Sequence, residues 1–239
     1  MSVEGYLLII PLAVSLCIGL FLICRGDKAY QALNKAFSLW VLGNAFWYAQ
    51  WILETVNMDM NRALFLFRLP LIVQLMIPSL FLYFILRFVN DRMTIPRMLF
   101  LWVPAILFGV LVIFDFMGSD LIIATLRLNN YGENTYGVVY RLPAFLIWLV
   151  YFVWYSVWGA GVLLAHVVRT AVVFHDASFR NLVAQRTFLL ASLSLLAFIL
   201  GLTLDIIIPI VYTRVFPVSS ITTVFMVGFM GRLLVCVER

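Results

Sequence analysis

Charged residues are scarce in this chain of 239 residues. Asp, Glu, Lys and Arg together make up 11% of it, whereas hydrophobic residues make up 65%. Cysteine occurs only three times, at Cys17, Cys24 and Cys236, which is too few for a disulfide framework. A chain with so little charge cannot cover itself with a water-soluble surface, so the composition predicts an integral membrane protein.

Motifs that carry catalysis are also missing. The chain has no phosphate-binding glycine loop, no HExxH, no paired CxxC and no GxSxG. His166 and His175 have no third ligand at metal spacing. We therefore expect no catalytic residue, no metal site and no cofactor.

Two families of seven-helix proteins are excluded by their own signatures. A retinal protein needs a lysine deep inside the membrane for its Schiff base, but the only lysines, Lys28 and Lys35, lie at the inner face, between the first apolar stretch and the start of the second. Animal-type receptors carry Asp-Arg-Tyr after the third span and Asn-Pro-x-x-Tyr in the seventh, and neither motif occurs here.

What the chain does contain is long apolar runs. A membrane-spanning helix needs about 20 apolar residues. Seven stretches qualify, each continuously apolar, unlike the alternating strands of a membrane barrel. They are Tyr6–Cys24, Leu33–Val56, Ala63–Val89, Met98–Met117, Pro143–Val168, Thr187–Pro209 and Ser219–Val237. We expect an all-α membrane protein, a bundle of seven transmembrane helices.

The basic residues predict how this bundle is oriented. Lys and Arg favour the cytoplasmic side of short loops. Of the 16 Lys and Arg residues, only five fall at one face, namely Arg62, Arg68, Arg127, Arg141 and Arg214. The N-terminus is therefore expected outside and the C-terminus in the cytoplasm. The net charge of +5 follows from this topology, so no nucleic-acid partner is needed to explain it.

The connections are too short for a second domain, so residues 1–239 are expected to form one. The longest connection, Gly118–Leu142, has strand-like runs at Ile122–Leu128 and Thr135–Tyr140 around a turn-rich centre. This pattern predicts a short extracellular hairpin between the fourth and fifth spans, although a compact loop would also fit.

Glu54 and Arg68 are opposite charges just inside consecutive spans. If the chain turns around residues 58–60, the two lie at depths that differ by about 6 Å, at 1.5 Å rise per residue. Intramembrane charges are costly and are usually paired and turned inward. We expect a Glu54–Arg68 ion pair in the outer leaflet, with Asp205 of the sixth span at the same level.

Polar and aromatic residues accompany these charges. The second span carries a stripe at helical spacing, and Gln74 lies in the third. The stripe comprises Trp40, Asn44, Trp47, Trp51 and Glu54. Two interpretations carry equal weight: Glu54, Arg68 and Asp205 form a ligand pocket, or they form a structural ion-pair network that fixes the helix register.

A further set of residues is informative through its order along the chain. They are Trp51-Ile52-Leu53-Glu54 at the outer end of the second span, Phe67-Arg68, Pro78 and Leu82-Tyr83-Phe84 in the third, Gly137 before the fifth, and Arg180 and Gln185 before the sixth. In order and type they resemble the seven-helix N-terminal sensor region of bacterial histidine kinases, over roughly Trp40 to the C-terminus. The sequence ends where a catalytic module of that family would begin.

The resemblance implies a sensory input module of two-component signal transduction in the bacterial inner membrane. A small-molecule or lipid-like ligand would bind near Glu54, Arg68 and Asp205, and the last span would relay the signal, with Gly228, Gly231 and Arg232 as candidate relay residues. An attached cytoplasmic effector would imply a homodimer. The main alternative is a small seven-helix transporter or channel, and a membrane enzyme ranks third.

Overall fold

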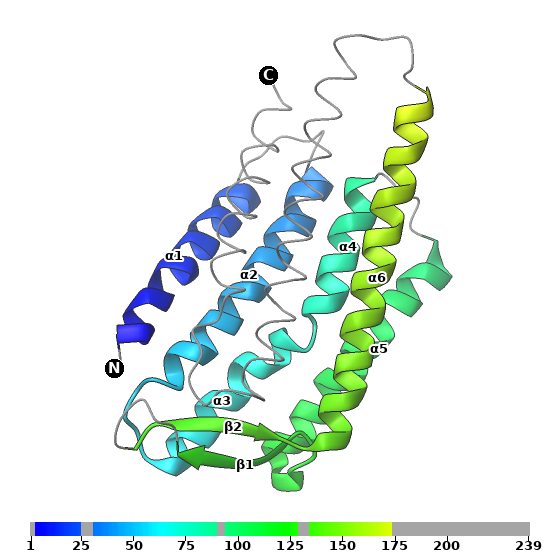
Figure 1. Cartoon of the computed structure of the whole chain (residues 1–239). Helices are drawn as coiled ribbons and strands as arrows, with labels where there is room; N and C mark the ends of the chain where they lie inside the picture. Colours follow the sequence, from blue (N-terminus) through cyan, green and yellow to red (C-terminus); the bar gives the residue numbers. More distant parts are fainter. Residues whose placement is uncertain (1–2, 25–30, 90–93, 129–133, 174–239) are drawn as a thin grey trace.

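The computed structural model describes residues 3–24, 31–89, 94–128 and 134–173, and this part of the chain is mostly helical (Figure 1). The elements in chain order are α1 (Val3–Cys24), α2 (Gln31–Leu53), α3 (Met60–Gln74), α4 (Ile77–Phe88), α5 (Ile95–Phe114), the π-helical segment η1 (Asp115–Ser119), β1 (Ile123–Leu128), β2 (Tyr136–Tyr140) and α6 (Leu142–Val173).

Four helical stretches of the described residues are long and apolar enough to cross a membrane. They are Gly5–Cys24, Met60–Phe88, Ile95–Ser119 and Leu142–His166. Large apolar side chains on them face outward, including Ile10 at 58% exposure, Ile106 at 59% and Val150 at 69%. Lipid, rather than water, suits such a surface. The prediction of a helical membrane protein is confirmed at this level.

The count of seven spans extends beyond what the structure describes. The predicted spans Thr187–Pro209 and Ser219–Val237 lie outside the described residues. The predicted span Leu33–Val56 does form a helix, α2, but α2 is not among the four apolar stretches. Lys35, Asn44 and Gln50 lower its hydropathy.

The third predicted span is two helices rather than one. Ala63–Val89 was expected to run through Pro78 as a single helix, but α3 ends at Gln74 and α4 begins at Ile77. Proline lacks an amide hydrogen, and its ring clashes with the carbonyl four residues earlier, which here belongs to Gln74. Pro78 therefore lies in the first turn of α4, where its amide would have no helical partner.

The predicted hairpin is confirmed. β1 and β2 pair antiparallel, with Ile123 opposite Tyr140 and Leu128 opposite Tyr136. The hairpin lies across the end of the bundle at which α2 connects to α3 (Figure 1). The Met58 amide of that connection donates a hydrogen bond to the Asn134 carbonyl over 3.2 Å. The hairpin is thus tied to the helices it covers.

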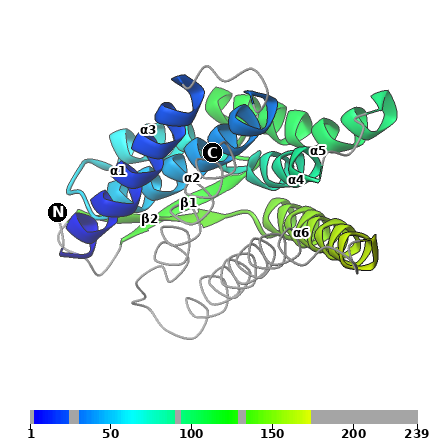
Figure 2. The same cartoon turned by 90° about the horizontal axis from the view of Figure 1, so that it is seen from above.

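α2 is central in the described bundle. It packs against α1 on one side and against α3 and α4 on another, and α4 in turn packs against α6. α1 and α6 lie at opposite sides of this arrangement (Figure 2). Gly159 allows the close approach of α6 to α4, because a Cβ there would lie 3.2 Å from the Phe81 ring.

Aromatic rings fill the half of the bundle away from the hairpin. Trp40 of α2 stacks on Phe84 of α4 with ring centroids 5.9 Å apart and planes 7° apart. Phe37 lies 5.1 Å from Phe84, and Phe81 lies 5.6 Å from Trp40. All four side chains are at most 3% exposed. This aromatic plug leaves the space between α2 and α4 closed at this level.

Candidate functional site

A cavity of about 610 Å³ lies beside the hairpin, walled by residues of α2, α3, α5, β2 and α6. Four of the predicted site residues line it: Trp47, Trp51, Glu54 and Gln74. The helical spacing in α2 places the first two on one face, and Glu54 follows just after the helix ends at Leu53. These four side chains therefore line one cavity, and their role in ligand binding stays a prediction.

The other described candidates lie elsewhere. The side-chain amide of Asn44, which is 4% exposed, donates to the Trp40 carbonyl over 2.9 Å within α2. Asn44 is thus a satisfied core residue and does not line the cavity. Asp205, Gly228, Gly231 and Arg232 lie outside the described residues.

The expected Glu54–Arg68 ion pair is wrong. Arg68 Nε lies 3.1 Å from Asp115 Oδ2, and its Nη2 lies 3.1 Å from Asp120 Oδ1. Depth alone suggested the pair with Glu54, but the two residues face different neighbours. The chain turns back after α5, and this turn brings both aspartates to Arg68.

The Arg68 network holds the hairpin onto α3. Asp115, which is fully buried, also accepts hydrogen bonds from the backbone amides of Ile122 over 2.8 Å and Ile123 over 3.4 Å. Asp120 adopts a left-handed conformation with φ of 48°, and its carbonyl accepts from Arg141 Nε over 3.1 Å. Arg68 is therefore part of a structural ion-pair network, but its partners are Asp115 and Asp120 rather than Glu54, while Asp205 lies outside the described residues.

The polar side chains of the cavity gather around Gln50. Its Nε2 donates to the Tyr140 hydroxyl over 3.0 Å and lies 3.5 Å from Glu54 Oε1. Burial raises the pKa of the Tyr140 phenol well above its ordinary value, and the nearby Glu54 carboxylate raises it further, against a lowering by the Gln50 hydrogen bond. Tyr140 therefore keeps its proton at neutral pH and can donate a hydrogen bond.

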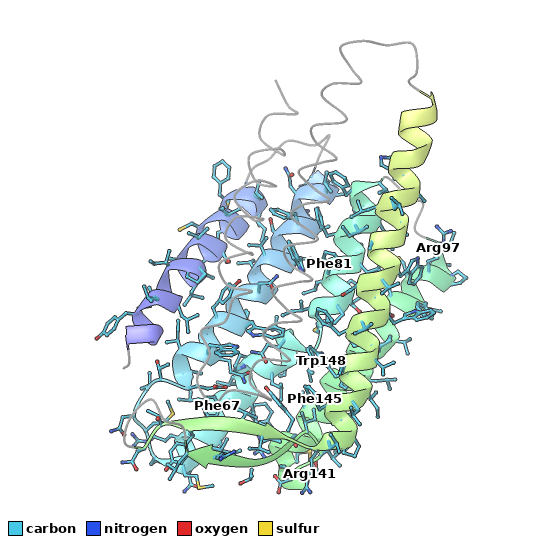
Figure 3. The ribbon with its side chains drawn as sticks, viewed as in Figure 1. Phe67, Phe81, Arg97, Arg141, Phe145 and Trp148 are labelled. Carbon is cyan, nitrogen blue, oxygen red and sulfur yellow. The ribbon has the colours of Figure 1, made fainter. Side chains whose placement is uncertain are left out.

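Aromatic rings form the remaining wall. Trp47 of α2 lies 6.1 Å from Trp148 of α6, Trp148 lies 6.3 Å from Phe145, and Phe145 stacks on Tyr140 at 6.3 Å with planes 18° apart. Phe145 and Trp148 lie toward the hairpin end of α6, whereas Phe81 of α4 lies farther from the hairpin (Figure 3). The rings therefore run as a continuous row from α2 to the hairpin.

Glu54 is the one formally charged side chain among the described residues that line the cavity. The rest of the lining is aromatic, aliphatic or amide. Gln50 Oε1 and Trp148 Nε1 are buried without a hydrogen-bond partner in the described part of the chain. Such a site offers no cluster of metal ligands, and the described residues contain no group of three His, Cys, Asp or Glu that could form one.

Sequence reasoning missed four residues: Gln50, Asp115, Asp120 and Tyr140. A signal existed for two of them. Asp115 lies within the predicted fourth span, so the argument applied to Glu54 and Arg68 also applies to it. Gln50 precedes Glu54 by four residues on the same helical face. Tyr140 and Asp120 reach their partners only through the hairpin fold.

Comparisons of the chain with protein-family models, with curated proteins and with solved structures find no match.

Proposed function

We propose that this chain is a membrane-embedded sensory input module, of the kind that precedes bacterial histidine kinases, and that its ligand binds in the aromatic cavity. The module would lie in the bacterial inner membrane with seven spans, its N-terminus outside and its C-terminus in the cytoplasm. The observation that carries the proposal is a cavity of about 610 Å³ whose aromatic lining encloses one carboxylate, at the end of the bundle covered by the hairpin. Ligand pockets have this mainly apolar character with a few polar groups.

The filled half of the bundle favours a sensor over a transporter or channel. A permeation path needs polar groups that reach both faces of the membrane. Between α2 and α4 the described residues instead form the aromatic plug of Phe37, Trp40, Phe81 and Phe84. A ligand that enters beside the hairpin therefore has no described route onward between these helices.

The cavity walls suggest how occupancy is transmitted. Trp148 lines the cavity, and Tyr151, three residues further along α6, bonds to Ser79 of α4, with hydroxyl oxygens 2.6 Å apart. A ligand that prefers one arrangement of α6 against α4 shifts the population toward that arrangement. Under this proposal the predicted last span, Ser219–Val237, carries the shift to a cytoplasmic effector.

The test joins a histidine-kinase catalytic module after Arg239 of the full chain and measures autophosphorylation in membrane vesicles while small amphiphilic compounds are added outside. A compound that changes the phosphorylation rate should lose its effect in Trp51→Ala, because this ring lines the cavity. Phe46→Ala is the matched control, since Phe46 lies on the same helix but is 44% exposed and does not line the cavity. An equal response in both variants would refute the cavity as the sensing site.

A further inference from the structure

The ligand class can be inferred from the charge and the rings of the cavity. We infer that the cavity binds an organic cation, an ammonium-type head group attached to an apolar body. This inference rests on the proposed function, since it names the chemistry of the ligand that the same cavity would sense.

The charge balance of the cavity favours a cation. Glu54 is half-buried and is the one formal charge among the described lining residues. Arg68, the cation expected to neutralise it, is bound to Asp115 and Asp120 instead. Among the described residues no cation takes the place of Arg68 beside Glu54. A carboxylate withdrawn from water without a cation is unfavourable, and a bound ammonium group offsets that cost. An anionic ligand would meet Glu54 with no described Lys or Arg in the wall to balance it.

The row of aromatic rings also favours a cation. The faces of Trp, Tyr and Phe attract a cation that lies within about 6 Å of the ring centroid, and Trp does so most strongly. Trp47, Trp148, Phe145 and Tyr140 follow one another at centroid distances of 6.1 to 6.3 Å. Glu54 lies near Tyr140, one of these rings, because Gln50 Nε2 is 3.5 Å from Glu54 Oε1 and 3.0 Å from the Tyr140 hydroxyl. A carboxylate beside several rings is the arrangement that binds quaternary ammonium groups.

The size of the cavity favours an organic rather than an inorganic cation. A cavity of about 610 Å³ lies in the range of drug-sized ligand pockets, about 300 to 1,000 Å³. Leu71, Leu75 and Phe108 line it in addition to the rings of the row. An inorganic cation would leave most of this apolar wall unused. The wall therefore selects a cation with an aromatic or branched aliphatic body.

The experiment compares three probes that share a phenyl ring and differ in charge: benzyltrimethylammonium, benzyl alcohol and benzenesulfonate. Binding to the full chain in lipid nanodiscs is measured by isothermal titration calorimetry, with empty nanodiscs to subtract partition into lipid. The cation should bind saturably and at least about tenfold more tightly than either other probe, because only the cation gains from both the carboxylate and the rings.

Two variants test whether the charge of Glu54, rather than the stability of the fold, determines how tightly the cation binds. Glu54→Gln should weaken benzyltrimethylammonium about tenfold or more and leave benzyl alcohol unchanged. Asp59→Asn is the matched control, since it removes a carboxylate at the same end of the bundle while Asn keeps the N-cap of α3, where Asp59 accepts from the amides of Asn61 and Arg62. The control should bind the cation as the unaltered chain does, and circular dichroism should report equal helix content for both variants.

Each other result contradicts the inference. Equal cation affinity in Glu54→Gln and Asp59→Asn, or no saturable binding of the cation, would overturn the assignment of the ligand class. If benzyl alcohol or benzenesulfonate binds instead, and Trp51→Ala abolishes that binding, the cavity remains a ligand site and the proposed function survives while the cationic ligand does not. Failure of the proposed function itself is read separately, from the phosphorylation assay.

Discussion

Arg68 is a buried charge in a membrane helix that is stabilised by its ion-pair partners. Its side chain is 10% exposed, and that of Asp115 is completely buried. Removing one member of a buried pair leaves the other charge unpaired in a low-dielectric environment. The fully buried Asp115 therefore depends on Arg68 more than the half-exposed Asp120 does.

The substitution Arg68→Leu should lower the free energy of unfolding by about 3–5 kcal/mol, because it leaves Asp115 buried and unpaired. Asp120→Asn should cost at most about 1 kcal/mol, because the Asp120 side chain is 51% exposed and water screens its pair with Arg68. Denaturant titration of the detergent-solubilised protein, followed by circular dichroism, measures both. Equal losses in the two variants would contradict the role assigned to Asp115.

Sequence reasoning located these residues in depth but did not identify their partners. Glu54, Trp47, Trp51 and Gln74 were predicted as a site and do line one cavity. Arg68 was predicted as the partner of Glu54 because the two residues lie at similar depths in the membrane. The rise per residue gives the depth of a side chain but not the direction in which it points. Which side of α3 meets which neighbour depends on packing, and the neighbours of Arg68 come from a turn distant in sequence.

At the scale of elements, glycines set how closely α6 approaches its neighbours. Gly159 and Gly161 lie two residues apart in α6 but in different surroundings. A Cβ at Gly159 would lie 3.2 Å from Phe81, whereas a Cβ at Gly161 meets nothing within 4 Å among its neighbours. Only the first of them is a packing glycine of the α4–α6 contact.

Gly159→Leu should therefore lower the free energy of unfolding by about 1–3 kcal/mol, because the added side chain must displace Phe81 from a filled core. Gly161→Leu adds the same side chain two residues away in open space, so we expect no loss of stability, and a small gain from helix propensity. Thermal unfolding of the two variants in the same detergent checks this. A larger loss in Gly161→Leu would show that the α4–α6 contact is misassigned.

Elements themselves were predicted well where their signals were local. Apolar runs and turn residues predicted the helices and the hairpin. The signal of Pro78 is also local, since the missing amide hydrogen and the clash with the Gln74 carbonyl favour a helix end. The prediction of one continuous span underestimated that effect. Asp120, the left-handed residue that follows the π-helical segment, is bonded to Arg68 through its carboxylate, and this contact distant in sequence had no comparable local signal.

The described bundle differs between its two ends. One end carries the cavity and the hairpin, and the other half of the described bundle is filled by the aromatic plug. The positive-inside rule predicts that the cavity end faces outside. Under that orientation an external ligand reaches Glu54 without crossing the membrane. We therefore expect the cavity to open to the outside and to receive the signal there.

The most direct measurement is labelling of a cysteine at the cavity wall in intact spheroplasts. The native Cys17, Cys24 and Cys236 are first replaced by serine, and Val139→Cys is then introduced in β2, because Val139 is 37% exposed and lines the cavity. A membrane-impermeant maleimide should label this position from outside, and benzyltrimethylammonium should slow the labelling. Labelling that appears only after the membrane is permeabilised would contradict the account.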